Sequence, residues 1–354
     1  NIPENEYHIF MGPEVDTQIN VRDFPSNFHF YKFRYHPSSV IHRFKTIRLL
    51  RNLEKKIKPD CVFTPFGPSY WTPISPHLVG FARGYYLYPD SPFFTITGLP
   101  MKVKIRLLKK LHRCFFRKNS QYYTVESDDA KKRLSLFIHK DLSNIHVISN
   151  TYHPVFNLPV NSNKNILPQK KNNEIRLLAL SAYYSHKNLE IIPRVIDILN
   201  KQNDYSFVFI LTIDHKVFSK KFTKWKNNLV NLGPVPIALC PKLYQESDML
   251  FLPTLIEIFT AAYPEAMKTK KLIITSDLSF SREICGDAAE YFNPLNPEDI
   301  AAKIIRVARD SKHRKALIRK GEKRLLLFET PESRTKKLLE ICAKISGTRR
   351  NKAN

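Results

Sequence analysis

The sequence has few acidic residues, few cysteines and few glycines, and it contains no long apolar run. No apolar segment approaches the roughly 18–20 residues needed to cross a bilayer, and no basic-then-apolar leader is visible at its start. The five cysteines are scattered without the paired spacing of a metal site, which favours thiols in a reducing compartment. We therefore expect a cytoplasmic protein without a transmembrane helix.

The shortage of acid leaves 57 basic against 32 acidic residues and a formal charge of +25. Such an excess favours a polyanion or an anionic surface as a neighbour. It is densest in Met101–Lys118, which has eight basic residues, no acid and apolar residues between them at helical spacing. This segment suits an anionic membrane surface, and an ordinary packed helix with a solvated basic face fits equally well.

Several function classes lack support in the sequence. No helix-turn-helix, zinc-finger or aromatic-basic pattern indicates nucleic acid. No paired aspartates end a strand, since Asp128-Asp129 opens a helix, and no Ser/His/Asp or Cys/His motif is present. We expect neither a metal ion nor a bound cofactor.

Apolar strands alternate with helical stretches along the whole chain, which predicts an α/β fold with parallel sheets. A length of 354 residues suffices for two domains. We predict a first domain at 1–150, a second at 151–330 after an Asn-, Pro- and Lys-rich connection, and a helix with a basic tail at 331–354. A doubly wound domain normally opens with a strand and a Gly-rich turn, which the start of this sequence lacks, so we expect a βα unit of about 30 residues to be missing before it.

Glu257 and Glu265 lie eight residues apart where a strand at Asp248–Pro253, a loop at Thr254–Phe259 and a helix at Ala261–Lys270 are predicted. Spacing alone fits two solvated charges. In this setting both carboxylates can face one cleft, where they accept hydrogen bonds from sugar or ribose hydroxyls beside the helix N-terminus. The pattern therefore favours a nucleotide-sugar ligand.

The run from Asp248 to Asp287 resembles the donor-binding signature of retaining glycosyltransferase family 4, the glycogen-synthase-like group. The matching places are Pro253-Thr254, Glu257-Ile258-Phe259-Thr260, Glu265-Ala266-Met267, Leu272–Thr275 and Arg282–Gly286. The resemblance implies the GT-B fold, in which two Rossmann-like doubly wound domains face a central cleft. It makes the first domain the acceptor side and the second the nucleotide-sugar domain.

The resemblance also assigns roles in binding the nucleotide sugar. Ser181–Glu190 is similar to the family's diphosphate clamp, in which Lys187 and Asn188 match while Ala182 replaces the arginine. Lys187 and Glu257 are the catalytic candidates. The donor-binding candidates are Glu265 at the ribose, Ile258, Phe259 and Thr260 beside the phosphates or sugar, Asn188 and Gly233. Thr260 replaces a glycine, which narrows the approach to the sugar, and the family needs no metal or general base.

Candidates for the acceptor side come from the segment between Asp60 and Phe94, which resembles a bacterial branch of the family. They are Gly67, Ser69, Tyr70, His77 and Arg83. The aromatic side chains Tyr70, Trp71, Tyr85 and Tyr86 fit stacking on a sugar, and they fit packing of a loop-rich cap at least as well.

The resulting prediction is a retaining glycosyltransferase that uses a nucleotide-diphosphate sugar and a lipid-linked or polysaccharide acceptor in cell-surface glycan synthesis. It would work in the cytoplasm, peripherally on an anionic membrane through residues 101–118. Two alternatives remain: a degenerate domain of this fold that binds a glycan or a partner protein, and a sugar-nucleotide epimerase, for which the first domain shows no catalytic carboxylates.

Overall fold

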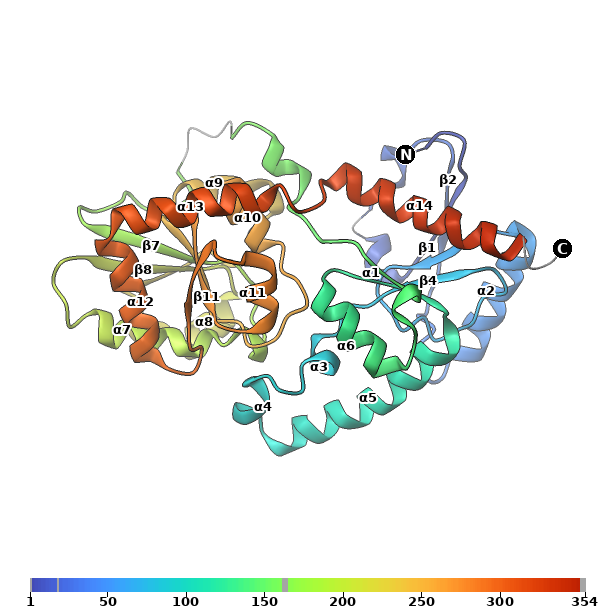
Figure 1. Cartoon of the computed structure of the whole chain (residues 1–354), viewed down its shortest axis with the longest axis horizontal. Coiled ribbons are helices and arrows are strands. Elements are labelled where there is room, and N and C mark those ends of the chain that lie inside the picture. Colours follow the sequence, from blue (N-terminus) through green and yellow to red (C-terminus); the bar gives the residue numbers. More distant parts are fainter. Residues whose placement is uncertain (1, 18, 161–164, 351–354) are drawn as a thin grey trace. The chain divides into compact units, whose positions relative to one another are not determined.

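The computed structural model of the protein describes residues 2–17, 19–160 and 165–350 (Figure 1). The chain divides into two compact units. The first comprises Asn1–Phe81, Lys110–Thr124 and Glu340–Asn354, and the second comprises Ala82–Lys109 and Val125–Leu339. The domain boundaries predicted at 150 and 330 remain predictions.

The first unit contains short parallel strands beside a long helix. Strands β1 (Tyr7–Met11) and β2 (Phe28–Lys32) pair in parallel, as do β3 (Val62–Thr64), β4 (His77–Gly80) and β5 (Tyr122–Val125) in succession. Helix α1 (Pro13–Asp16) follows β1, and α2 (Arg43–Ile57) precedes β3. Leu50 of α2 is buried with Phe33 and Trp71 in a small apolar cluster, so the inner face of α2 forms part of this core.

The second unit is built on a six-stranded parallel sheet with the order β12-β11-β10-β7-β8-β9. The strands are β7 (Glu174–Ala179), β8 (Ser206–Leu211), β9 (Leu229–Asn231), β10 (Met249–Leu252), β11 (Leu272–Ser276) and β12 (Ala289–Phe292). All residues of β7, β10, β11 and β12 are buried. Burial on both faces explains why most of these strands are nearly continuous apolar runs in the sequence.

Helices cover both faces of this sheet (Figure 1). Helix α12 packs against α7, and α13 packs against α10 and β11. The helices that follow the sheet strands are α7 (Ile192–Leu199), α8 (His215–Lys221), α9 (Cys240–Gln245), α10 (Ala262–Lys268), α11 (Ser279–Cys285), α12 (Pro297–Arg309) and α13 (Ser311–Leu325). Side chains from the helices and strands form one apolar core, which includes Ile192, Phe209, Phe251 and Ile304.

The remaining elements lie outside this sheet. The second unit also contains α3 (Gly84–Leu87), α4 (Phe93–Ile96), α6 (Asp128–Ile138) and β6 (Ile145–Val147). Helix α5 (Leu99–Asn119) belongs to the second unit up to Lys109, and α14 (Pro331–Arg350) belongs to it up to Leu339. None of the described helices combines the length and the apolar character needed to cross a membrane.

The predicted strand, loop and helix around Glu257 are confirmed as β10, the loop 253–261 and α10. The sequence also predicts a basic helix around Phe218–Asn228, and the structure differs there, because α8 begins at His215 and ends at Lys221, and a 3-10 turn at Thr223–Trp225 follows. The reason is a cap: the Asp214 side chain accepts from the backbone N–H groups of Lys216 and Val217 and starts the helix early.

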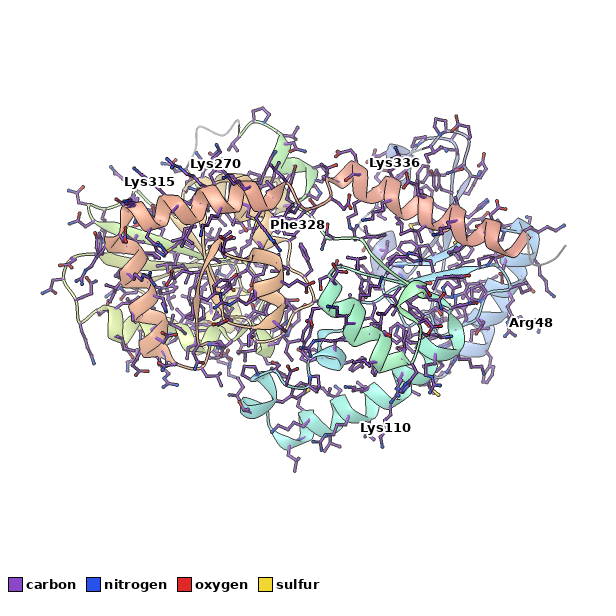
Figure 2. The ribbon with its side chains drawn as sticks, in the orientation of Figure 1. Arg48, Lys110, Lys270, Lys315, Phe328 and Lys336 are labelled. Carbon is purple, nitrogen blue, oxygen red and sulfur yellow. The ribbon has the colours of Figure 1, made fainter. Side chains whose placement is uncertain are left out.

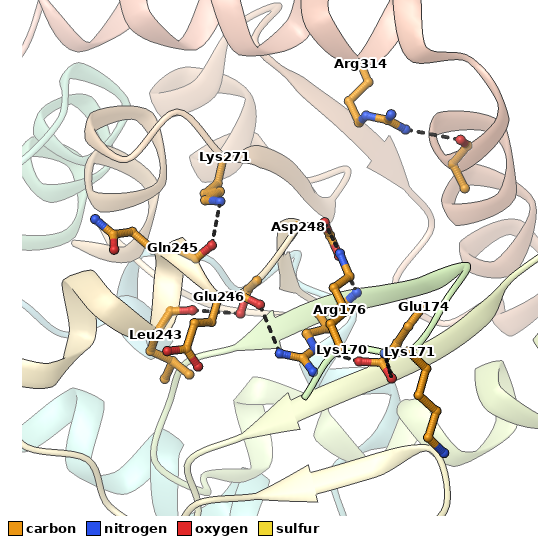
Figure 3. A network of polar contacts seen from close by, with 12 residues as sticks. Lys170, Lys171, Glu174, Arg176, Leu243, Gln245, Glu246, Asp248, Lys271 and Arg314 are labelled. Carbon is orange, nitrogen blue, oxygen red and sulfur yellow. Dashed lines mark hydrogen bonds and ion pairs between the residues drawn. The ribbon is translucent and has the colours of Figure 1, made fainter. Parts of the chain in front are cut away.

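A polar network at the amino ends of β7 and β10 fastens the segment that precedes β7 (Figure 3). The Arg176 guanidinium donates to Glu174 Oε1 at 2.6 Å and to the Pro168 carbonyl at 2.6 Å. Asp248 accepts from the Arg176 N–H at 2.8 Å and from Lys170 Nζ at 2.7 Å. These contacts lie at the end of the strands opposite to the loops described next, so their role is structural.

Candidate functional site

The strand order of the second unit places two loops side by side. The chain builds β8 and β9 on one side of β7 and then returns to build β10, β11 and β12 on the other side. In open parallel sheets, ligands bind at the carboxyl ends of the strands where the order reverses. Here those ends lead into loop 180–188 after β7 and loop 253–261 after β10.

Lys187 and Glu257, the two catalytic candidates, meet at this point. Lys187 Nζ donates a hydrogen bond to Glu257 Oε1, and both side chains are largely shielded from water. The backbone N–H of Leu255 donates to the carbonyl of His186 at 2.8 Å and ties the two loops together. The arrangement offers a cation and a carboxylate in one place of low solvent access, where each acts more strongly than in water.

His186 connects this pair to the segment that contains α3. Its Nδ1 is 2.6 Å from the Tyr85 hydroxyl, and its Nε2 is 4.0 Å from Glu257 Oε1. Burial, with a smaller contribution from the Lys187 charge, lowers the pKa of His186 to about 4. The imidazole is therefore neutral at pH 7, and it lies between the Tyr85 hydroxyl and the Glu257 carboxylate.

The same segment also supports the loop after β10. The Ser91 hydroxyl donates to the Leu255 carbonyl at 2.7 Å. Gly84 lies so close to this loop that an added Cβ would stand 2.7 Å from Ile256 Cγ2 and 3.5 Å from the Glu257 carbonyl carbon. Neither Gly84 nor Ser91 follows from a sequence motif, because their role comes only from this packing.

Ile258, Phe259 and Thr260 continue the loop beyond Glu257. The side chains of Ile258 and Phe259 are buried, and the Phe259 ring packs edge-on against Phe328 at 5.7 Å. Among the described residues, none accepts a hydrogen bond from the backbone N–H groups of these three residues. The loop therefore keeps polar N–H groups available beside the Lys187–Glu257 pair.

Glu265 lies on α10 and is 5% exposed. Its Oε2 accepts from the Tyr244 hydroxyl at 3.1 Å, a partner that the sequence does not indicate. Burial raises the pKa of Glu265 to about 7, although the Tyr244 hydrogen bond opposes this shift. A ligand hydroxyl that donates a hydrogen bond to the Glu265 carboxylate would stabilise its charged form.

Asn188 and Gly233 occupy different surroundings. Asn188 has the left-handed conformation that asparagine tolerates, with φ of 53°, and its buried side chain donates to the Pro294 carbonyl at 2.8 Å. Pro294 also lines a cavity of about 460 Å³, whose polar side chains are Asp277, Tyr291, Asn293, Asp299 and Lys303. Gly233 follows β9, which β8 separates from β7, and it packs against His215.

The acceptor-side candidates of the first unit are engaged in internal contacts. His77 is buried, with Nε2 2.9 Å from the Thr64 hydroxyl and Nδ1 2.7 Å from the Asn119 carbonyl. The Ser69 hydroxyl donates to the Trp71 carbonyl at 2.7 Å, and the Tyr70 hydroxyl lies 3.0 Å from His112 Nε2. Gly67 precedes a cis proline and faces the Phe116 ring. A role of these residues with an acceptor stays a prediction.

Arg83 lies in the second unit, exposed at the start of α3. Of the aromatic candidates, Trp71 and Tyr86 are buried, which favours packing for these two, whereas Tyr70 and Tyr85 are partly exposed. Among the described residues, no group of three His, Cys, Asp or Glu side chains could hold a metal ion. The expectation that no metal is required remains a prediction.

Comparison with known proteins gives two findings. Residues 162–324 match the family model described as "Glycosyl transferases group 1", a segment that contains all the loops above from β7 to β12. A search of curated proteins finds no match.

Solved glycosyltransferase structures share the fold of the chain. A glycosyltransferase from Rickettsia africae is 16% identical with a TM-score of 0.68, and the match covers 96% of this chain and 99% of the Rickettsia chain. HepE from Anabaena, in complex with UDP and glucose, is 10% identical with a TM-score of 0.66, covering 95% and 91%. WaaG, which is involved in lipopolysaccharide biosynthesis, is 14% identical with a TM-score of 0.63, covering 89% and 86%. The predicted α/β fold of GT-B type is confirmed.

Proposed function

We propose that this chain, whose residues 162–324 match the group 1 glycosyltransferase model, is an enzyme that moves a sugar from a nucleotide-diphosphate donor to a lipid-linked or polysaccharide acceptor with retention of anomeric configuration. The strongest support is the Lys187–Glu257 pair at the point where the strand order of that domain reverses. HepE, of the same fold, binds UDP and glucose, which favours a UDP-sugar as the first donor to test.

In the proposed reaction, the bond between the anomeric carbon and the diphosphate breaks, and negative charge grows on the leaving diphosphate. Lys187 has three N–H donors, so its ammonium can hold Glu257 with one and a phosphate oxygen with another. The backbone N–H groups of residues 258–260 add further donors in the same place. Groups fixed before the reaction stabilise such charge well in a shielded site.

The carboxylates serve binding in this proposal. Glu257 accepts hydrogen bonds from hydroxyls of the sugar, while Glu265 accepts from the ribose. Asn188 supports the loop of Lys187 through Pro294. The leaving phosphate itself assists deprotonation of the acceptor on the same face of the sugar, so no side chain is assigned as a general base.

We further propose that the enzyme works on the cytoplasmic side of a bacterial membrane, in synthesis of a surface glycan. Support comes from WaaG, a protein of the same fold involved in lipopolysaccharide biosynthesis, and from α5. The side chains of Leu99, Val103, Leu107 and Leu111, four residues apart along α5, are all exposed. Lys104, Arg106 and Lys110 are exposed between them, which suits a helix lying on an anionic bilayer.

The test is a binding panel of UDP-, GDP- and ADP-sugars measured by calorimetry with the wild type, Lys187→Ala and Glu265→Ala. We expect one nucleotide class to bind and both variants to weaken it, because each removes a charged partner of the ligand. Lys216→Ala, which changes an exposed lysine on α8, serves as the control. Failure of every nucleotide sugar to bind the wild type would refute the enzyme proposal.

One observation favours a second candidate function. Ala182 stands where the resemblance places an arginine of the diphosphate clamp, which fits a domain that binds a glycan or a partner protein without catalysis. A hydrolysis assay on the same nucleotide sugars separates the two, since a degenerate domain would release no nucleoside diphosphate, whereas the enzyme would release it slowly.

A further inference from the structure

Three apolar side chains, two just before α2 and one in its first turn, are almost fully exposed. Val40 is 89% exposed, and Ile41 and Phe44 are each 85% exposed. They do not belong to the inner face of α2, which packs through Leu50 into the core of the first unit. Exposed apolar patches are typical of surfaces that contact a membrane or another protein. We call Val40, Ile41 and Phe44 the tip.

The tip is held in place by its neighbours. The His42 N–H donates to the Ser39 hydroxyl at 3.3 Å, and the Ser39 N–H donates to the His36 carbonyl at 2.9 Å. The His42 ring stacks on Tyr35 at 3.6 Å, and the Thr46 N–H donates to the His42 carbonyl. The backbone around the tip is therefore fixed, and its side chains project from a defined frame.

The charges around the tip indicate which kind of partner it contacts. Residues 24–53 contain six lysines and arginines and no acid. Lys45, Arg48 and Arg51 are exposed on α2 just beyond the tip, and Figure 2 labels Arg48 there. A projecting apolar tip beside basic side chains fits a bilayer, whose acyl region accepts apolar groups while anionic headgroups pair with the cations.

The tip also adjoins the basic surface of α5 within the first unit. The Arg43 guanidinium donates to the Tyr70 carbonyl at 3.2 Å and lies 4.6 Å from the centre of the Phe115 ring. The part of α5 that belongs to this unit exposes Lys110, Arg117 and Lys118. Basic charge thus continues from α2 to α5.

We propose that Val40, Ile41 and Phe44 insert into a bilayer with anionic headgroups and form a membrane contact distinct from α5. The proposal does not depend on sugar transfer, and it can hold or fail independently of the α5 contact. Each inserted side chain removes its apolar surface from water, so its loss should weaken membrane partitioning about tenfold.

The experiment measures sedimentation of the full chain with vesicles of phosphatidylcholine, with and without phosphatidylglycerol. Ile41→Ser/Phe44→Ser should weaken binding to the anionic vesicles about a hundredfold. Leu326→Ser/Leu327→Ser, which changes two leucines that are 83% and 69% exposed in the second unit, should leave it unchanged. Both variants should keep the wild-type melting temperature and nucleotide-sugar binding, since the changed side chains are exposed.

A direct probe of insertion is Phe44→Trp. Its fluorescence should shift to the blue on anionic vesicles and be quenched by brominated lipids, beyond the response of the wild type. Unchanged vesicle binding of Ile41→Ser/Phe44→Ser, or fluorescence of the introduced tryptophan that brominated lipids leave unquenched, would overturn the proposal. So would a dimer in solution that the double substitution abolishes, because a second copy of the chain would then cover the tip.

Discussion

Glu265 is a carboxyl group whose burial has a measurable energetic consequence. Because its pKa in the folded protein is about 7, raised from 4.5 by burial, the folded state holds a proton that the unfolded state has released between these two pH values. The contribution of Glu265 to the free energy of unfolding is therefore greatest below about pH 4.5, and it falls as the pH rises to about 7.

Glu265→Gln should remove this dependence. Relative to the wild type, we expect the variant to gain about 1–3 kcal/mol in free energy of unfolding between pH 5 and pH 8. Thermal unfolding at a series of pH values measures it. Glu126, whose pKa burial also raises to about 7, titrates in both proteins and cancels in the difference. Parallel pH profiles for the two proteins would contradict the assignment.

Tyr85 is predicted to fix the His186 imidazole. Tyr85→Phe removes the hydroxyl that bonds Nδ1, so the nitrogen NMR shifts of His186 should change, and stability should fall by about 0.5–1.5 kcal/mol. Tyr184→Phe is the matched control, because the Tyr184 ring stacks on His186 at 5.5 Å and stacking survives the change. If the two variants give the same His186 spectrum, the hydrogen bond has no orienting role.

At this scale the sequence predicts some site residues and not others. Lys187 and Glu257 were predicted because each belongs to a short motif at a strand end, and the structure brings them together. The contact of Tyr85 with His186 joins residues 101 positions apart. No local pattern in the chain encodes such a contact, since it arises from the packing of α3 against the loops.

Among the elements, the loop after β10 depends on close packing of the segment around α3. Gly84→Ala places a Cβ 2.7 Å from Ile256 Cγ2, so we expect the loop to shift and stability to fall by about 1–3 kcal/mol. Gly98→Ala, whose Cβ would meet nothing closer than 3.8 Å, should be nearly neutral. Calorimetry on both variants, with nucleotide-sugar affinity as a second readout, decides whether this packing matters.

Helix α5 gives a second prediction at this scale. Lys104→Ala/Arg106→Ala/Lys110→Ala should weaken binding to anionic vesicles about a hundredfold, since each basic residue near such a surface contributes about 1 kcal/mol. Lys216→Ala/Lys220→Ala/Lys224→Ala on and after α8 removes the same charge elsewhere. Equal binding of both triple variants would mean that α5 is a packed helix with a solvated basic face.

The strand before Glu257 was predicted from its uninterrupted apolar run, and the structure has β10 there, whereas the sequence did not predict β12. Its residues Ala289–Phe292 include Glu290, which is buried and accepts from His313 Nε2 at 2.8 Å and Arg306 at 3.3 Å. A charged residue interrupts the apolar run that identifies a buried strand. The side chains that pair with buried Glu290 come from α12 and α13, so the sequence around Glu290 does not indicate them.

For the whole molecule, the composition and the motifs indicate different properties. The excess of 25 positive charges indicates an anionic neighbour but no chemistry. The chemistry follows from the second unit, where the strand order, the Lys187–Glu257 pair and the match to group 1 glycosyltransferases coincide. One direct measurement tests both the proposed donor and the proposed retention.

That measurement uses NMR to monitor the slow hydrolysis of the nucleotide sugar that binds best. The spectra identify which anomer of the sugar is released first. The account predicts release of the nucleoside diphosphate with the sugar in its original configuration. Lys187→Ala should slow it about 10²–10³-fold, as for loss of one group that stabilises the transition state, while Lys216→Ala keeps the wild-type rate. Release of the inverted anomer, or a Lys187→Ala rate equal to that of the wild type, would contradict the account.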